Sequence, residues 1–301
     1  MRCLIIGHGS IGQRHARLLA EMGHEVAVLS RRQVDIPMLF HSLDQALAWN
    51  PGYVVVANAT AEHATSLSRL AAAGYGGTVL VEKPMSTEPL VSLDFPFHLH
   101  VGFNLRFHPV IRDLAVRIAD HKLFSAQAYV GQYLPDWRPD TDYRQCYSAK
   151  AAEGGGVVFD LSHELDYLLH LFGSWRRVAA LGGHFSDLEI DSVDTAQLLL
   201  ECDRCPAVSV ELNYLDRMVR RDITINGDFG TIRANLVAGT VIHNGETTTH
   251  QVPRDSLYIA QHAEMTGGGA KFVCSAPEGQ LATSLAVAAH RAMTSGQWIV
   301  P

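Results

Sequence analysis

The sequence predicts an α/β protein: a doubly wound parallel sheet in residues 1–105, followed by an α+β domain with a mostly antiparallel open sheet in residues 106–301. Three observations lead to this fold class. The 301-residue chain exceeds what one hydrophobic core usually holds. Its first hundred residues alternate short apolar runs with helical patterns, which is the rhythm of βαβ units. After about residue 105, strand-like runs follow one another with turns between them.

The first domain is built from buried strands and connecting helices. Short runs rich in valine, leucine and isoleucine predict strands at residues 3–7, 25–30, 53–59 and 78–84. Apolar residues at helical spacing predict helices over 11–23 and 60–74, each ending at a glycine. This order predicts parallel strands whose carboxyl ends meet at one edge of the sheet.

The second domain has few helices. Alternating patterns predict strands at residues 123–131, 177–185, 193–201, 206–215, 220–226 and 229–236. Helical spacing predicts helices over 157–172 and 278–295. The segments 132–153 and 264–277 are polar or glycine-rich, and we expect them to be functional loops.

Composition excludes several classes of partner. The chain has 24 basic and 31 acidic residues, a net charge of −7, and no basic stripe, so we expect no nucleic-acid partner. The first apolar run is four residues long and no later run approaches a membrane span, so a cytoplasmic protein without membrane contact is expected. Cys202 and Cys205 form a C-x-x-C pair without a second pair, which favours a hairpin turn over a metal or redox site.

A glycine motif follows the first strand. Gly7, Gly9 and Gly12 form G-x-G-x-x-G at the start of a helix, which predicts a Rossmann dinucleotide site over residues 7–12. The second strand ends in Ser30, Arg31 and Arg32 and lacks the acidic residue typical of NAD sites. Because guanidinium groups suit a 2′-phosphate, we expect NADP(H) to be preferred over NAD(H). The alternative is that both arginines are ordinary surface residues.

Two further segments carry candidate chemistry. Lys83 stands at the carboxyl end of a strand, where it could hold developing alkoxide charge, although a surface lysine is the alternative. The segment GGGVVFDLSHELDYLLHLFG, residues 154–173, is predicted to form one two-faced helix. Its polar side would carry Asp160, His163, Asp166, Tyr167 and His170.

Histidine and aspartate on one helix face suggest proton transfer. Asp160 and His163 are three residues apart, so the carboxylate could orient the imidazole as a general base. A solvated helix face is one alternative, and a metal held by Asp160, His163 and His170 is another. We expect no metal.

With these residues in view, the chain resembles the Gfo/Idh/MocA family. The resemblance rests on the glycine motif with Arg14-His15, on NATAEH (58–63), on Glu82-Lys83-Pro84, on VGFNLRFHP (101–109) and on the glycine-led Asp/His segment. It implies an NAD(P)-dependent oxidoreductase that acts on a hydroxyl or keto carbon of a sugar, sugar derivative or cyclitol. It also implies a homodimer or homotetramer formed through the C-terminal sheet.

The resemblance also implies residue roles. The catalytic residues would be Lys83, His163 and Asp160. The cofactor would be bound by Gly7, Gly9, Ser10, Ile11, Gly12, Ser30, Arg31, Arg32, Asn58, Ala59, Thr60, His63, Glu82, Lys83, Asn104 and Arg106. The substrate would be contacted by Lys83, Arg106, Asp160, His163 and Tyr167.

One departure separates this chain from the family pattern. The family spacing is D-x-G-x-H, whereas this chain reads D-L-S-H, so His163 is better supported as the base than Asp160. The wording DLSHELDYL resembles a subgroup associated with surface-sugar and nonulosonate biosynthesis, which implies a nucleotide-linked or acidic sugar. Two alternatives remain: glycosidase-type elimination with a retained cofactor, and a non-catalytic dinucleotide-binding sensor.

Overall fold

The computed structural model describes residues 1–138 and 140–301; residue 139, inside the loop predicted over 132–153, lies outside the described residues. The chain forms two units. The first unit contains Met1–Phe107 and Pro253–Gln280, and the second contains His108–Val252 and Leu281–Pro301. The sequence predicts a single domain boundary near residue 105. In the structure the chain also returns to the first unit over residues 253–280. Met265 and Val273 from the returning segment join the apolar core of this unit, and such a tertiary contact has no local sequence signal.

The first unit is built on a seven-stranded sheet with the order β15-β6-β5-β4-β1-β2-β3. Its strands are β1 (Arg2–Ile6), β2 (Glu25–Leu29), β3 (Leu39–Phe40), β4 (Tyr53–Val56), β5 (Thr78–Val81), β6 (His98–Val101) and β15 (Cys274–Ser275). Strands β1 to β6 pair in parallel, and β15 pairs antiparallel with β6. Strand order reverses direction between β1 and β4, which is the point where open α/β sheets bind ligands.

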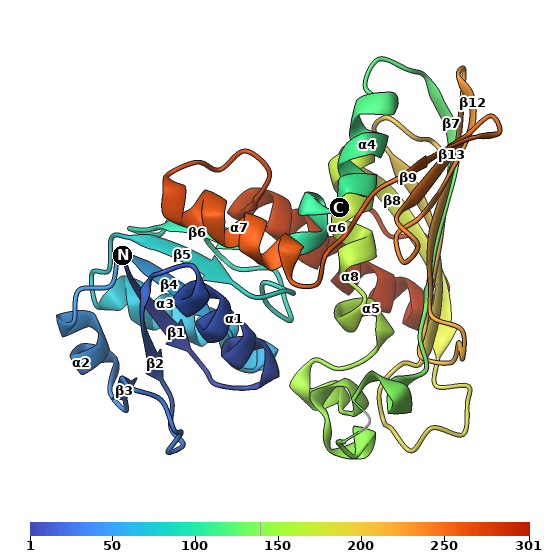
Figure 1. Ribbon diagram of the computed structural model, residues 1–301. Helices are drawn as coiled ribbons and strands as arrows, with labels where there is room; N and C mark the ends of the chain where they lie inside the picture. The colour runs from blue at the N-terminus through green and yellow to red at the C-terminus, as the bar shows by residue number, and fades with distance from the viewer. Residues whose placement is uncertain (139) are drawn as a thin grey trace. The chain divides into compact units, whose positions relative to one another are not determined.

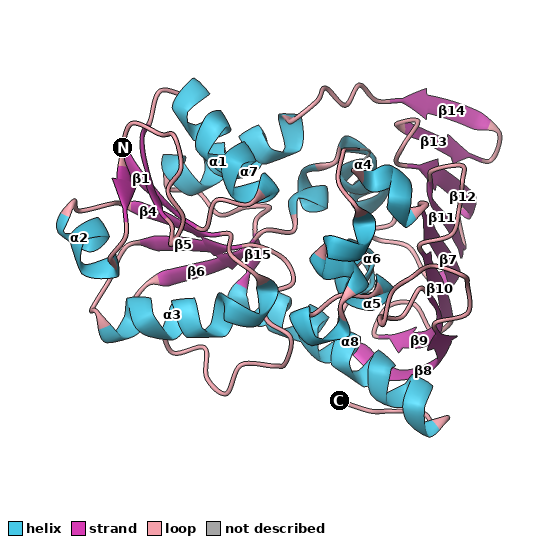
Figure 2. Cartoon of the chain, turned by 90° about the horizontal axis from the view of Figure 1, so that it is seen from below, coloured by secondary structure: helices cyan, strands magenta, loops and turns pink. Residues whose placement is uncertain are grey.

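Helices cover both faces of this sheet. They are α1 (Ser10–Glu21), α2 (Leu43–Ala48), α3 (His63–Ala72) and α7 (Ser256–Gly267), with short 3₁₀ turns η1 (Thr60–Glu62) and η2 (Asn104–Phe107). Figure 2 shows α1 and α7 on one side of the sheet and α3 on the other. Central strands are apolar and buried along their length because neither face meets water. The predicted Rossmann architecture is therefore confirmed.

The second unit is built on an eight-stranded sheet with the order β14-β13-β12-β11-β7-β10-β9-β8. Its strands are β7 (Leu123–Gly131), β8 (Trp175–Gly183), β9 (Thr195–Cys202), β10 (Val208–Asn213), β11 (Arg220–Gly227), β12 (Gly230–Asn235), β13 (Thr240–His243) and β14 (Glu246–Thr249). Strands β7 and β10 pair in parallel, and the other neighbouring pairs are antiparallel. The mostly antiparallel sheet predicted for this part of the chain is confirmed.

The C-x-x-C pair lies in the turn between β9 and β10. These two strands pair antiparallel, and the backbone N–H of Cys202 donates to the carbonyl of Cys205 at 3.0 Å. Both cysteines are buried and free. The prediction of a hairpin turn is confirmed.

Helices in the second unit are α4 (Pro109–Arg117), α5 (Val157–Asp160), α6 (His163–Phe172) and α8 (Ala276–Ser295), whose first residues belong to the first unit. Short 3₁₀ turns fill the loop before α5: η3 (Leu134–Trp137), η4 (Tyr143–Gln145), η5 (Tyr147–Ala149) and η6 (Ala151–Glu153). Figure 1 labels these helices, and Figure 2 shows that they lie on one face of the sheet. The single helix predicted over 157–172 is wrong, since α5 ends before α6 begins. Helices α4 and α7 and the hairpin β13–β14 had not been predicted.

Within the described residues, every helix is too short or too polar to span a lipid bilayer.

Candidate functional site

The glycine loop connects β1 to α1 and combines tight packing with one open position. Gly7 has φ +99°, and a Cβ there would lie 2.7 Å from the backbone of Asn58. A Cβ on Gly12 would lie 2.3 Å from the carbonyl oxygen of Gly7. A Cβ on Gly9 would meet nothing within 4 Å. The open space at Gly9 adjoins the N-terminus of α1, which fits a pyrophosphate, because helical N–H groups and the helix dipole favour an anion there. The other predicted members of the loop, in the first turn of α1, are Ser10 and Ile11.

Two arginines follow β2. The hydroxyl of Ser30 accepts the backbone N–H of Arg32 at 3.1 Å. The Arg32 guanidinium donates to the carbonyl of His8, a member of the glycine loop, at 3.3 Å. Arg31 is mostly exposed and pairs with Glu62. The structure therefore puts a cationic pair at the same sheet edge as the glycine loop.

The segment after β4 is held by side chains. The Asn58 amide donates to Glu62 at 3.1 Å and to Ser66 at 2.9 Å. His63 is buried, with Nδ1 2.9 Å from the carbonyl of Pro84 and Nε2 3.2 Å from that of Asn58. Burial lowers the pKa of His63 from its ordinary value. His63 thus links the ends of β4 and β5. The remaining predicted cofactor residues of this segment are Ala59 and Thr60.

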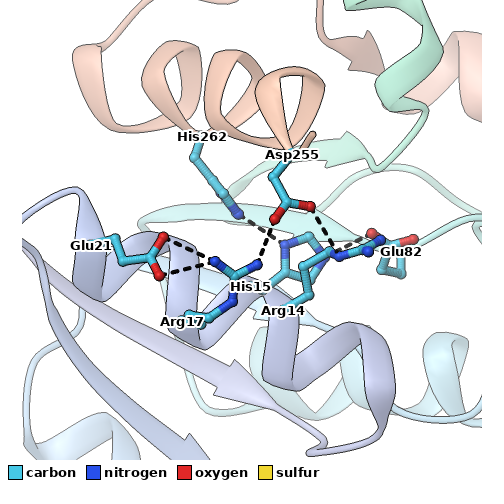
Figure 3. A network of polar contacts seen from close by, with 7 residues as sticks. All are labelled: Arg14, His15, Arg17, Glu21, Glu82, Asp255 and His262. Carbon is cyan, nitrogen blue, oxygen red and sulfur yellow. Dashed lines mark hydrogen bonds and ion pairs between the residues drawn. The ribbon is translucent and has the colours of Figure 1, made fainter. Parts of the chain in front are cut away.

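A buried hydrogen-bonded chain lies behind the end of β5 (Figure 3). Glu82 Oε1 is 2.8 Å from His15 Nε2, and Glu82 Oε2 accepts the backbone N–H of Lys83 at 3.1 Å. His15 Nδ1 is 2.9 Å from His262 Nε2, whose Nδ1 is 3.1 Å from the hydroxyl of Tyr53. Burial acts to raise the pKa of Glu82, but the hydrogen bond and charge of His15 outweigh it and hold the value low. Burial holds the pKa of His262 well below its ordinary value.

Helix α7 is fixed to α1 by charge. Asp255 lies 3.3 Å from Arg14 and 2.6 Å from Arg17, and Arg17 also contacts Glu21 at 3.0 Å (Figure 3). The guanidinium of Arg14 stacks on the ring of Tyr258 at 5.1 Å. The sequence did not predict that α7 contacts α1, because these contacts join residues more than two hundred positions apart. The sole local signal is an aspartate directly before a helical segment.

Two residues of the predicted cofactor set lie in η2. Asn104 and Arg106 are both buried. Arg106 donates to Glu278 at 2.7 Å, and Glu278 also accepts from the backbone and hydroxyl of Ser275 at 2.9 and 2.6 Å. Arg106 is therefore a buried, paired cation of the first unit.

The polar series of residues 160–170 does not share one helix side. Leu161 leaves the helical conformation with φ −96° and ψ 26°, and α6 begins anew at His163. In α6, Asp166 and Tyr167 are buried, whereas His170 is exposed. The prediction of one continuous helix is wrong, because the break leaves Asp160 in α5 and the later polar residues in α6. His163 itself is partly exposed.

Asp160 lies among aromatic hydroxyls. It is 4% exposed, and the hydroxyl of Tyr214 donates to Asp160 Oδ2 at 2.6 Å. Burial raises the pKa of Tyr147 well above its ordinary value, and the charge of Asp160 and a hydrogen bond to it raise it further. The ring edge of Trp137 packs on Tyr214 with centroids 5.2 Å apart. Asp160 therefore joins the loop before α5 to the end of β10.

Tyr167, predicted to contact substrate, is fully buried. It lies in a cluster with Glu164, which is itself 0% exposed and 2.8 Å from the Nε of Arg221 on β11. Burial raises the pKa of Tyr167 well above its ordinary value, and the neighbouring Glu164 charge adds to this. Among residues 1–138 and 140–301, no three or more His, Cys, Asp or Glu side chains are grouped so as to hold a metal ion.

The glycine loop, the strand order and the sheet edge define a Rossmann-type NAD(H)-binding protein. Comparison with family models agrees. The oxidoreductase family model for an NAD-binding Rossmann fold matches residues 1–92, and the GFO/IDH/MocA C-terminal domain model matches residues 117–233. The chain belongs to the GFO/IDH/MocA family of oxidoreductases. A search of curated protein sequences finds no match.

Solved structures share the fold over the whole chain. GenD2 from gentamicin A biosynthesis, in complex with NAD, is 20% identical with a TM-score of 0.83, covering 100% of this chain and 96% of that one. The WlbA dehydrogenase from Bordetella pertussis, in complex with NADH and UDP-GlcNAcA, is 22% identical with a TM-score of 0.80, covering 100% and 98%. The UDP-N-acetylglucosamine 3-dehydrogenase GnnA from Acidithiobacillus ferrooxidans is 19% identical with a TM-score of 0.81, covering 99% of each chain.

Proposed function

We propose that the protein is an NAD(P)-dependent dehydrogenase or reductase that acts on a CH–OH group of a sugar, sugar derivative or cyclitol. The observation that carries the proposal is the shared sheet edge. The open glycine position follows β1, and Lys83 follows β5 at the same edge of the parallel sheet. The proposed cofactor loop and the lysine therefore follow strands that end at one edge of the sheet, which supports hydride transfer at a carbon whose oxygen needs a positive partner.

The residues that would hold the cofactor belong to the first unit. The glycine loop would take the pyrophosphate, and the segment from Asn58 to His63 and the chain near Lys83 would adjoin the nicotinamide. When bound, the nicotinamide ring supplies or accepts hydride. Arg31 and Arg32 support a preference for NADP(H) over NAD(H). Both follow β2, and the position at the end of this strand, which is acidic in typical NAD sites, holds Ser30.

The proposed proton chemistry uses two residues. In oxidation, His163 takes the proton of the substrate hydroxyl while Lys83 holds the oxygen as negative charge develops. In reduction, His163 returns that proton. Asp160 is the proposed partner of His163, and its buried carboxylate, held by Tyr214, would add negative charge three residues before His163, where α6 begins.

The substrate is proposed to be a nucleotide-linked sugar. WlbA was solved in complex with UDP-GlcNAcA, and GnnA is a UDP-N-acetylglucosamine 3-dehydrogenase. The DLSHELDYL segment resembles a family subgroup associated with surface-sugar and nonulosonate biosynthesis. The loop before α5 carries Trp137, Arg138 and Tyr143, aromatic and cationic groups that suit a ring with an anionic substituent.

We also propose self-association through the C-terminal sheet. Leu181 on β8 and Leu199 on β9 are 70% and 55% exposed, and Trp298 beside them is 49% exposed. Trp298 packs under the guanidinium of Arg177 at 4.8 Å. Apolar side chains gathered on one sheet edge of this kind typically mark an interface. Light scattering should report a dimer or tetramer, and Leu199→Glu should shift it toward the monomer.

The direct test compares Lys83→Ala and His163→Ala with the wild-type protein. Turnover of a UDP-sugar panel is followed by NAD(P)H absorbance, and cofactor binding by fluorescence. We expect each variant to lose at least a hundredfold in kcat, with the dissociation constant for NADPH changed less than threefold. Wild-type turnover in either variant would overturn its assigned role. Cleavage of a glycoside without net NAD(P)H change would instead favour elimination chemistry, and tight cofactor binding without turnover would favour a sensor.

A further inference from the structure

Glu82 is a buried carboxylate whose side-chain partner is a histidine. Its side chain is 9% exposed, and a carboxylate removed from water must be hydrogen-bonded. A Cβ on Gly102 would lie 3.0 Å from Glu82 Oε1, so the carboxylate is enclosed on that side as well. One oxygen faces His15 and the other accepts the N–H of Lys83. The carboxylate is therefore held in one orientation directly beside the backbone of the proposed catalytic lysine.

The direction of each hydrogen bond in the chain follows from what each group can donate. An ionised Glu82 only accepts, so the proton of His15 lies on Nε2. When His15 accepts at Nδ1, His262 carries its proton on Nε2. His262 accepts at Nδ1 from the Tyr53 hydroxyl. Each donor of the chain then meets one acceptor.

Burial supports this assignment independently of the bond directions. His15, His262 and Tyr53 are all 0% exposed. Desolvation keeps His262 neutral, because its pKa lies well below the ordinary value, and keeps Tyr53 protonated, because burial raises its pKa well above the ordinary value. Both groups are thus fixed in the states that the directed chain needs.

We propose that the buried chain Tyr53–His262–His15–Glu82 positions Lys83. The chain holds the Glu82 carboxylate in a fixed orientation against the backbone of residue 83. The inference rests on the proposed role of Lys83. His262 comes from α7, so the segment that returns to the first unit completes the chain from a distance of 247 residues in sequence. Residues remote from substrate then govern the placement of the cationic side chain.

The first test is Glu82→Gln, which keeps the size of the side chain and an acceptor for the Lys83 N–H but removes the charge. His15 and His262 can reverse their tautomers to suit the carboxamide, so the fold should be kept. We expect kcat to fall at least tenfold, with KM and the NADPH dissociation constant changed less than threefold. The pH profile of kcat should also change, because the variant lacks the buried negative charge beside the residue 83 backbone.

The matched control is Glu21→Gln, the same change of chemistry on an exposed carboxylate of α1 that also belongs to the polar network of Figure 3. It should leave kcat and its pH profile unchanged. His262→Gln tests the remote end of the chain, and it should lower kcat without changing KM. Wild-type kcat and pH profile in Glu82→Gln, alongside an inactive Lys83→Ala, would overturn the positioning role and leave the proposed function standing. An active Lys83→Ala would overturn the proposed function itself.

A measurement on the wild-type protein avoids the question of folding. Long-range ¹H–¹⁵N NMR of the histidine rings reports tautomer and charge directly. At pH 7 we expect both rings to carry a proton on Nε2, and His262 to be neutral. A missing Nε2 proton on either ring, or a cationic His262, would overturn the directed chain.

Discussion

Two alanine substitutions in the glycine loop, three residues apart, should affect different properties: Gly12→Ala the stability of the protein, and Gly9→Ala its affinity for the cofactor. A methyl on Gly12 would stand 2.3 Å from the Gly7 carbonyl oxygen, and ordinary contacts begin near 3.4 Å. Helix α1 would therefore move by about 1 Å or the loop would distort. Overpacking of this kind costs about 1–3 kcal/mol, and the better helix propensity of alanine offsets up to about 1 kcal/mol. We expect Gly12→Ala to lower the free energy of unfolding by about 1–2 kcal/mol.

Gly9→Ala should not change the free energy of unfolding of the cofactor-free protein. Gly9 has φ −77° and ψ −172°, which alanine adopts freely, and its Cβ meets nothing within 4 Å. The same methyl would occupy the space proposed for the pyrophosphate. Each charge-assisted hydrogen bond that is lost there costs about 1.5–3 kcal/mol, which is roughly a tenfold to hundredfold loss of affinity.

The assay is urea unfolding without cofactor, followed by fluorescence titration with NADPH. Gly269→Ala is the matched control, since its Cβ also meets nothing within 4 Å and it lies in the same unit. It should change neither stability nor affinity. Wild-type affinity in Gly9→Ala would refute the pyrophosphate placement, and a fully stable Gly12→Ala would refute the packing argument.

Three further predictions concern the buried polar groups. His108 caps α4 by accepting the Val110 N–H, and burial lowers its pKa to about 4. The pKa of this histidine in the unfolded chain is about 6.5, so its contribution to stability is complete above that pH and is lost as the pH falls toward 4. The free energy of unfolding should therefore drop by about 2 kcal/mol between pH 7 and 5. Urea titrations at several pH values should show that His108→Asn removes this part of the pH dependence of the free energy of unfolding. An unchanged pH dependence would contradict the role of His108. Tyr214→Phe should lower stability by about 1–3 kcal/mol in thermal melts, because Asp160 loses a donor at 2.6 Å; an equal melting temperature would show that water replaces it. Burial raises the pKa of Cys3 and Cys202 to about 12, so at pH 8 a thiol reagent should modify the half-exposed Cys146 first, and fast labelling of Cys202 would contradict the hairpin assignment.

Local pattern was sufficient for the strands and the glycine loop. Strands such as β4 are continuous apolar runs with glycines and polar residues beside them, and parallel pairing follows from the helices between them. Gly7 and Gly12 have backbone reasons to be glycine that a motif encodes directly. For this reason the Rossmann unit and its candidate nucleotide edge could be predicted before any contact was known.

Nonlocal contacts account for what the sequence did not reveal. Asp255, Tyr258 and His262 contact side chains of α1 and β4 from the far end of the chain, and no periodicity in their own segment indicates these contacts. Asp160 was predicted from spacing alone, whereas its hydrogen bond to Tyr214 depends on where β10 ends. The predicted helix over 157–172 is interrupted at Leu161. The apolar spacing continues through this residue, but its backbone leaves the helical conformation.

The central claim is that Lys83 and the glycine loop serve hydride transfer to or from a sugar carbon. Its most direct measurement uses NADPH carrying deuterium at C4, incubated with the protein and a keto UDP-sugar, with the product analysed by mass spectrometry. We predict that one deuterium appears on a sugar carbon in the wild-type product and none with Lys83→Ala. Tight NADPH binding with no deuterium in any sugar product would contradict the claim.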